Sequence, residues 1–237
     1  MTRAPKPRHA ADGGYTRGEE TRARIVAAAL KLFGDRGFDG ASTRDIAMAA
    51  DVNAPALQYY FNNKEGVYLA CTEHIVSRLL EHLGQVLGHA EQVLADGGGD
   101  EALIDAFCGI QERVADFMFT SEEHAAWRLF IAREQAGLDP AVDSQTVSQR
   151  LGKPMLAITS AIVGRLLGQP ASDEETQLTA MTLNGQLAMF QVMRRAALAR
   201  LNWDTIDARR TGLLKRVVIG QTRTLMFAMV ARREAAK

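Results

Sequence analysis

Apolar residues recur along most of this chain at intervals of three and four, which is the period of one face of an α-helix. The first such stripe holds Ile25, Ala29 and Phe33 and stops at Gly37, a residue typical of the position after a helix end. No stretch of any length shows the strict apolar–polar alternation of a half-buried strand. The pattern therefore predicts an all-α protein.

Two short helices joined by a tight turn are predicted next. Ser42, with Asp45 three residues later, forms a capping-box pattern that begins the first helix. Asn53 is the N-cap of the second helix, and Pro55 lies in its first turn, where a missing backbone donor costs least. We expect this second helix to cover residues 54–61. Short helices at this spacing are typical of a DNA-reading helix-turn-helix, although such pairs also occur as plain packing units.

The outer surface of the second helix is polar and aromatic when Leu57 and Phe61 face inward. In helix-turn-helix complexes this helix enters the major groove, where amide side chains pair with base edges while hydroxyls and cations contact phosphates. A DNA-contacting surface is therefore predicted here. Its residues are Thr43, Arg44, Asn53, Ala54, Pro55, Gln58, Tyr59, Tyr60 and Lys64.

Longer helices follow the short pair. The first is predicted to begin at Asn62 or Asn63 and to end at the glycine-rich break over residues 96–99, so that it links the short helices to the rest of the chain. We expect a cap at Ser172 and Glu175 for a later helix. The remaining helical patterns cover residues 103–117, 127–137, 154–167, 173–200 and 205–233.

Charge and composition limit the classes of function. The chain has 237 residues and a formal net charge of zero, so attraction to DNA must come from local segregation of charge. Basic residues are concentrated near the N-terminus, where residues 1–17 show no periodicity and predict a mobile basic arm. Cys71 and Cys108 lack the spacing of metal ligands and are expected to be buried or unreactive thiols in a reducing cytoplasm.

Neither a membrane segment nor an enzyme site is predicted. The basic start of the chain is not followed by the apolar core of a signal peptide. The longest uncharged run, over residues 176–193, is interrupted by Gln177, Asn184, Gln186 and Gln191. HExxH, Glu-x-x-His and glycine-rich phosphate-loop motifs are absent from the sequence. We therefore expect no catalysis, no cofactor, no metal and a cytoplasmic location.

Many spaced positions in the first third of the chain resemble one family of bacterial transcriptional regulators. These positions are Ile25, Leu30, Phe33, Gly37, Thr43, Ile46, Ala47, Ala50, Val52, Asn53, Tyr60, Phe61, Lys64, Glu65 and Leu69. Together they look like the N-terminal domain of the tetracycline-repressor (TetR) family. The second half of the chain resembles the branch of that family with a CecR-like C-terminal effector domain, over residues 130–134, 139–140, 184–190 and 196–203.

The resemblance implies a helix-turn-helix domain over residues 18–66 and an effector-binding and dimerisation domain over residues 67–237. It implies a homodimer that represses by binding a palindromic operator in double-stranded DNA and that is released by an unknown small-molecule effector. Asp51, Pro55 and Gln58 depart from the family pattern, which affects sequence preference more than fold. Asp51 stands at a turn position that often needs positive φ, which Asp tolerates better than most residues.

The effector would act by tilting the long helix from residue 64 to residue 94, which changes the distance between the two DNA-reading surfaces. A different class of function stays open. A helical adaptor that binds proteins and not DNA would keep the apolar faces without needing Arg44, Gln58 or Lys64.

Two further surfaces are expected in the C-terminal half. Aromatic and charged residues that would line an effector pocket are Phe107, Met118, Trp127, Phe130, Arg133, Glu134, Phe190 and Arg194. For each of these, ordinary core packing is the alternative, and Arg133 and Glu134 alternatively pair with each other. Weakly charged stripes that predict a two-fold dimer interface contain Leu178, Met181, Gly185, Met189, Val192, Leu213, Val217 and Gly220. The alternative is that both stripes complete the core of the monomer.

Overall fold

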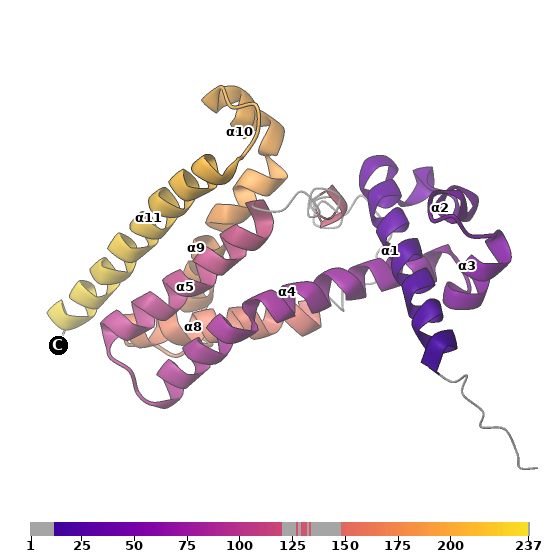
Figure 1. Ribbon diagram of the computed structural model, residues 1–237. Coiled ribbons are helices and arrows are strands. Elements are labelled where there is room, and N and C mark those ends of the chain that lie inside the picture. The colour runs from indigo at the N-terminus through magenta and orange to yellow at the C-terminus, as the bar shows by residue number, and fades with distance from the viewer. Residues whose placement is uncertain (1–11, 120–126, 128, 132, 134–147, 237) are drawn as a thin grey trace, which may run out of the picture.

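The computed structural model describes residues 12–119, 127, 129–131, 133 and 148–236, and of residues 12–16 and 148 only the backbone. Within these ranges every regular element is helical, which confirms the all-α prediction. Figure 1 shows three helices at one end of the molecule, a long helix leading away from them, and a second group of helices around its far half.

The first three helices form a unit that we call the head. They are α1 (Asp12–Gly40), α2 (Thr43–Ala49) and α3 (Ala54–Phe61). Helix α1 is interrupted at Gly37, which adopts φ 75° and ψ 175°, as expected from a glycine at the end of the first stripe. Buried Phe33, Ile46, Leu57 and Phe61 meet in one core, so the apolar face of each helix points to the others.

Helix α1 begins at Asp12, although residues 12–17 were expected to belong to the mobile arm. Adding a turn to a helix that already exists costs much less than nucleating one, so the helix extends beyond the apolar stripe that signals it. Residues 1–11 of the predicted arm lie outside the described residues.

The long helix α4 (Lys64–Ala95) begins where the sequence predicts. The side chain of Asn63 caps it by accepting a hydrogen bond of 2.8 Å from the backbone N–H of Gly66. Gly66 also lies against the carbonyl oxygen of Phe61, where a Cβ atom would overlap it. The absence of a side chain at Gly66 allows α4 to begin close behind the end of α3. From there α4 runs from the head into the second group of helices (Figure 1).

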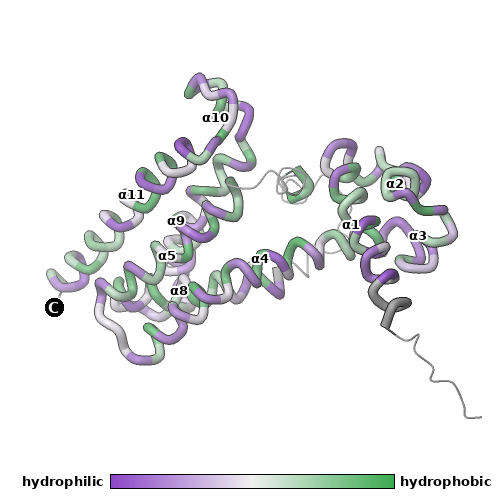
Figure 2. The backbone as a smooth tube through the Cα atoms, viewed as in Figure 1, coloured by the Kyte–Doolittle hydropathy of each residue, from purple (hydrophilic) through white to green (hydrophobic). Residues whose placement is uncertain are grey.

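The second group, which we call the body, packs around the far part of α4. Its elements are α5 (Asp100–Phe119), the π-helix η1 (Ser148–Gly152), α8 (Lys153–Leu167), α9 (Glu174–Val192), α10 (Arg194–Leu201) and α11 (Ala208–Ala235). Helix α5 lies between α4 and α11, and α8 packs against α9. Figure 2 shows apolar and polar residues interleaved along these helices.

Three boundaries in the body differ from the prediction. The helix expected over residues 173–200 is two helices, separated at Met193, whose φ of −98° and ψ of 25° leave the helical range. Its cap is Asp173 and not Ser172, because the Asp173 carboxylate accepts from the N–H of Thr176. The last helix begins at Ala208 and not near residue 205, since Asp207 caps it in the same way.

The structure also establishes the state of the two thiols. Cys71 and Cys108 are both free and buried. Burial raises the pKa of Cys71, and it raises the pKa of Cys108 to about 11. Within the described ranges, no three His, Cys, Asp or Glu side chains gather as metal ligands, and no helix has the length and apolarity to cross a membrane.

Candidate nucleic-acid interface and effector cavity

The start of α2 is fixed by the capping box that the sequence predicts. The backbone N–H of Asp45 donates to Ser42 Oγ at 3.1 Å, and the backbone N–H of Ser42 donates to Asp45 Oδ2 at 3.2 Å. The Ser42 hydroxyl donates to the same carboxylate oxygen at 2.7 Å. These hydrogen bonds, with a smaller contribution from the Arg36 and Arg44 charges, hold the pKa of Asp45 below its ordinary value.

The turn between α2 and α3 is held by backbone and side-chain hydrogen bonds. Asp51 has a φ of 53°, which confirms the expectation of a left-handed residue there. The backbone N–H of Val52 donates to the Ala47 carbonyl at 3.0 Å. Asn53 Oδ1 then accepts from the N–H of Ala56 at 2.9 Å and caps α3. The orientation of α3 relative to α2 is therefore fixed by the turn.

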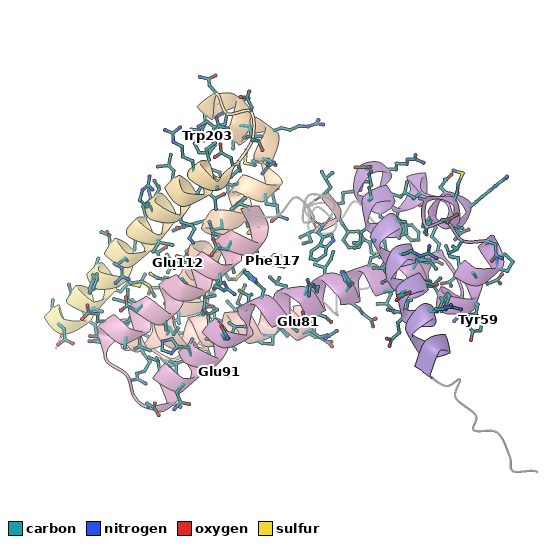
Figure 3. All side chains as sticks on the ribbon, in the orientation of Figure 1. Tyr59, Glu81, Glu91, Glu112, Phe117 and Trp203 are labelled. Carbon is teal, nitrogen blue, oxygen red and sulfur yellow. The ribbon has the colours of Figure 1, made fainter. Side chains whose placement is uncertain are left out.

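The outer face of α3 is open to solvent. Arg44, Asn53, Ala54, Pro55, Gln58 and Tyr59 are exposed, while Thr43, Tyr60 and Lys64 are partly buried. The side chain of Tyr59 is 82% exposed. Figure 3 shows it on the outer side of α3 in the head, whereas Trp203 lies in the body. Six of the nine predicted DNA-contacting residues are therefore open to solvent in the head, and their contact with DNA stays a prediction.

Tyr60 and Lys64 also have contacts inside the head. The ring of Tyr60 lies edge-on to Tyr59 at 5.2 Å, and its hydroxyl lies beside Gly18 of α1. The ammonium of Lys64 lies over the ring of Phe38 at 4.3 Å, a cation–π arrangement. Tyr60 and Lys64 are therefore held in place by packing, whereas Tyr59 is free of the core.

A cavity lies in the body next to the head. Its volume is about 220 Å³, below the roughly 300–1,000 Å³ typical of sites for drug-sized ligands. The described residues that line it are Thr72, Ile75, Val76, Leu79, Leu83, Val114, Phe117, Met118, Trp127, Phe130, Ile131, Leu151, Met155, Asn184, Leu187, Ala188 and Gln191. The walls are mostly apolar, so the cavity suits a small apolar molecule.

Three of the predicted pocket residues, Met118, Trp127 and Phe130, line this cavity. The other described candidates do not. Phe107 is fully buried in the core of the body, and Phe190 packs against a separate buried cluster. Neither Arg133 nor Arg194 lines the cavity, and Glu134 lies outside the described residues, so its pairing with Arg133 stays a prediction.

Sequence reasoning missed the polar groups of the cavity, Thr72, Asn184 and Gln191. Asn184 Nδ2 donates to Thr159 Oγ1 at 3.0 Å, and the Thr72 hydroxyl donates to the Tyr68 carbonyl at 3.3 Å. Asn184 and Gln191 are polar amides within the uncharged run over residues 176–193, and this was the one feature of the sequence that could have pointed to them. An isolated amide in an apolar helix is buried only where it has a polar function or partner.

The cavity wall is continuous with the core of the head. The Phe130 ring lies 4.6 Å from the Tyr68 ring and 6.5 Å from the Phe33 ring. Trp127 and Phe117 belong to the same buried cluster, and Figure 3 shows Phe117 at the end of α5 nearest the head. The guanidinium of Arg133 covers Gly37, where a Cβ atom would overlap it. Phe130 therefore contacts both the cavity and the head, and Arg133 contacts the head.

The predicted interface stripes lie on the surface of α9 and α11. Leu178, Met181, Met189, Val192, Leu213 and Val217 are all exposed by 39–55%. Gly185 and Gly220 are exposed too, and no atom lies within 4 Å of a Cβ placed on either one. The stripes are thus not used to complete the core of this single chain.

Sequence comparison agrees with this architecture. The profile of "Bacterial regulatory proteins, tetR family" matches residues 25–71, and that of "HTH-type transcriptional dual regulator CecR, C-terminal domain" matches residues 103–229. The chain belongs to the TetR family, with a CecR-type C-terminal domain. It is a transcriptional regulator, and this family consists of regulators and not of enzymes.

Individual relatives of this TetR-family regulator cover most of its length. The HTH-type transcriptional dual regulator CecR of Shigella flexneri is 29% identical over 202 residues, which is 85% of this chain and 89% of that protein. AibR, solved with isovaleryl coenzyme A and operator DNA, has a TM-score of 0.60 at 16% identity, covering 85% and 97% of the two chains. PfmR of Thermus thermophilus has a TM-score of 0.53 at 20% identity, covering 86% and 94%. The two structures show the shared fold.

Proposed function

We propose that this regulator binds a palindromic DNA operator as a homodimer, acts as a repressor, and leaves the operator when a small molecule occupies its cavity. The observation that carries the proposal is the solvent exposure of Tyr59 and Gln58 on α3 and of Arg44 on the preceding helix α2. A short helix with small residues at its start and amides and hydroxyls on its outer face fits the major groove of B-form DNA.

The stripes on α9 and α11 support the dimer. Leu178, Met181 and Val217 are large apolar side chains that lie exposed on the surface. Helix positions that face solvent usually carry polar side chains instead. A two-fold interface is self-complementary, so a pair of helices from each subunit would form a four-helix bundle that buries both stripes. Two heads related by this axis would require a palindromic site.

The position of the cavity supports the response to a ligand. Its wall shares Phe130 with the core of the head, and α4 joins the two. A molecule that binds better to one arrangement of Phe130 and α4 shifts the population of head orientations and thereby the affinity for DNA. AibR, which has the same fold, was solved with both an acyl-coenzyme A and operator DNA.

We further propose two functional units, a DNA-binding unit over residues 18–66 and an effector and dimerisation unit over residues 67–237. The capped start of α4 near Asn63 supports a boundary there. The units are not independent in folding, because Trp127 and Phe130 belong to the buried cluster of the head. A regulator of this kind acts at the chromosome, so a cytoplasmic location is part of the proposal.

Selection of bound sequences from random double-stranded DNA by the purified protein tests the proposal. We expect enrichment of a palindrome, steep loss of affinity as salt rises, and a shallower salt dependence for Arg44→Ala, because each phosphate contact releases counterions. Tyr59→Ala should weaken binding, whereas Arg78→Ala, which removes an exposed cation of α4 paired with Glu81, should not.

A helical adaptor would behave differently. It would select no DNA sequence, and its weak DNA affinity would respond equally to Arg44→Ala and Arg78→Ala. From that result we would conclude that the exposed surfaces bind proteins and not DNA.

A further inference from the structure

The most informative group in the cavity is the amide of Gln191. Its side chain is buried, with only 8% of the residue exposed, and it lines the cavity from α9. The hydrogen bonds between described residues include none to this amide, and its nitrogen and oxygen are not among the fully enclosed unpaired atoms of the described chain, so they keep access to open space. A buried amide without a partner costs free energy unless something in the cavity supplies a donor and an acceptor.

The second polar group lies two helical turns earlier on the same helix. One N–H of the Asn184 side chain donates to Thr159 Oγ1 at 3.0 Å. The side-chain carbonyl oxygen of Asn184 accepts no hydrogen bond from a described residue. Residues separated by seven positions lie on one face of a helix, about 10 Å apart along its axis. The cavity thus has polar groups at separated points along the α9 wall, with apolar side chains of α4 and α5 opposite.

The described lining contains no ionised side chain. Helix α9 carries no Lys or Arg, and Arg194 at the start of α10 is not part of the lining. A carboxylate placed in this space would lose its hydration without a counter-charge from these residues, which is far more costly than burying a neutral polar group.

We propose that the effector is a small, uncharged, mainly apolar molecule whose amide, lactam or similar donor–acceptor group pairs with the side-chain amide of Gln191. This inference rests on the proposed function, because it names the chemical class of the effector for that same cavity. A primary amide both donates and accepts, so a ligand amide satisfies it with two hydrogen bonds. The apolar remainder of the ligand then packs against Phe117, Trp127 and Phe130.

Two probes of the same shape test the charge requirement on the unaltered protein. Octanamide and octanoate differ only in the amide and carboxylate groups, and their binding to the full-length chain is measured by titration calorimetry. We expect octanamide to bind at least about tenfold more tightly. Quenching of Trp127 in a Trp203→Phe variant reports that the probe is in the cavity, because the chain has only two tryptophans. Equal or tighter binding of octanoate, or no binding of either probe, would overturn the proposal.

A matched pair of variants tests Gln191 itself. Gln191→Met keeps the length of the side chain and removes its amide, while Gln85→Met makes the same change at an exposed position of α4. We expect Gln191→Met to lower octanamide affinity about tenfold and to leave ethylbenzene affinity unchanged or higher. Gln85→Met should change neither. Equal octanamide affinities of the two variants would contradict the assigned role of Gln191.

Operator binding separates this inference from the proposed function. If octanamide binds as expected but does not change the affinity for the selected operator, the assignment of ligand chemistry stands and the proposed release from DNA fails. If octanamide also weakens operator binding, and Gln191→Met abolishes that effect at equal octanamide concentration, both are supported.

Discussion

Asp45 connects the sequence of α2 to the stability of the head through one carboxylate. It accepts hydrogen bonds from both the backbone N–H and the hydroxyl of Ser42, and these bonds lower its pKa. The start of α2, and Arg44 with it, is therefore positioned by a local capping box, which the spacing of Ser42 and Asp45 alone predicts. The side chain is exposed, so the effect should be modest but specific in its pH dependence.

The pH dependence of unfolding tests this capping box. Because the folded-state pKa of Asp45 lies below its ordinary value of 3.8, its contribution is present above that pH and is lost as the pH falls through the folded-state pKa. Asp45→Asn should therefore unfold at lower denaturant concentration than the wild type at neutral pH, and the two should converge in acid. Urea titrations over a pH series measure the difference. A difference that stays constant into acid would assign the effect to something other than this carboxylate.

Gly37 is the second residue whose chemistry is specific. Its φ of 75° and ψ of 175° lie in a region that is essentially restricted to glycine, and the guanidinium of Arg133 occupies the space of a Cβ. Gly37→Ala should lower the free energy of unfolding by about 1–3 kcal/mol, measured by chemical denaturation. Arg133→Ala supplies the matched background, where the overlap is gone and only the backbone strain remains. If Gly37→Ala costs the same in both backgrounds, Arg133 does not contribute to the penalty.

At the scale of elements, the caps of α2, α3 and α4 were predictable, whereas those of α9 and α11 and the break after α9 were not. Ser42, Asn53 and Asn63 each carry a side chain that accepts from a free N–H at a helix start, so α2, α3 and α4 begin where the sequence predicts. The separation of α9 from α10 at Met193 has no such local cause, because methionine is a good helix former. Periodicity predicted α4, α5, α8 and α11, but it predicted neither η1 nor the break that separates α10 from α9.

The cavity was harder to predict than the helices for a similar reason. The α4 residues Ile75, Leu79 and Leu83 belong to the same apolar stripe as residues of the closed core. Periodicity identifies the inward face of a helix, but the space left between two faces depends on how side chains from α5 and α9 fill it. Trp127 and Phe130, which line the cavity, were among the candidates because aromatic residues are common both in cores and in pockets.

The contact between Phe130 and the head gives an element-scale prediction. Phe130 is 2% exposed and packs on Tyr68 and Phe33, so Phe130→Ala should destabilise the protein by about 3–5 kcal/mol. Hydrogen exchange should accelerate in α1–α3, because the head loses a core residue. Phe119→Ala removes a buried ring from a separate cluster that includes Leu214 and serves as the control. Equal acceleration of α1–α3 by both variants would show that Phe130 has no special link to the head.

At the scale of the whole molecule, the exposed faces lie on different helices. The face of α3 belongs to the head, whereas the stripes on α9 and α11 belong to the body (Figure 1). With the proposed DNA surface on the head and the proposed dimer surface on the body, two heads would face the same duplex while the bodies pair. The cavity is lined by residues of α4, so under the proposed function a ligand there would act on the spacing of the heads.

The oligomeric state tests this arrangement directly. Met181 and Val217 are about half exposed on α9 and α11, and a glutamate at either position would place an unpaired charge in the proposed interface. Such a charge costs about 3–5 kcal/mol, which raises the dissociation constant of a dimer more than about a hundredfold. Sedimentation analysis should therefore find a dimeric wild type and monomeric Met181→Glu and Val217→Glu proteins with unchanged helical content. Met48→Glu alters an even more exposed methionine on α2, away from the stripes, and should stay dimeric. A wild type that is monomeric at micromolar concentration, or stripe variants that dimerise as well as Met48→Glu, would remove the palindrome requirement, because each head would then read its DNA alone.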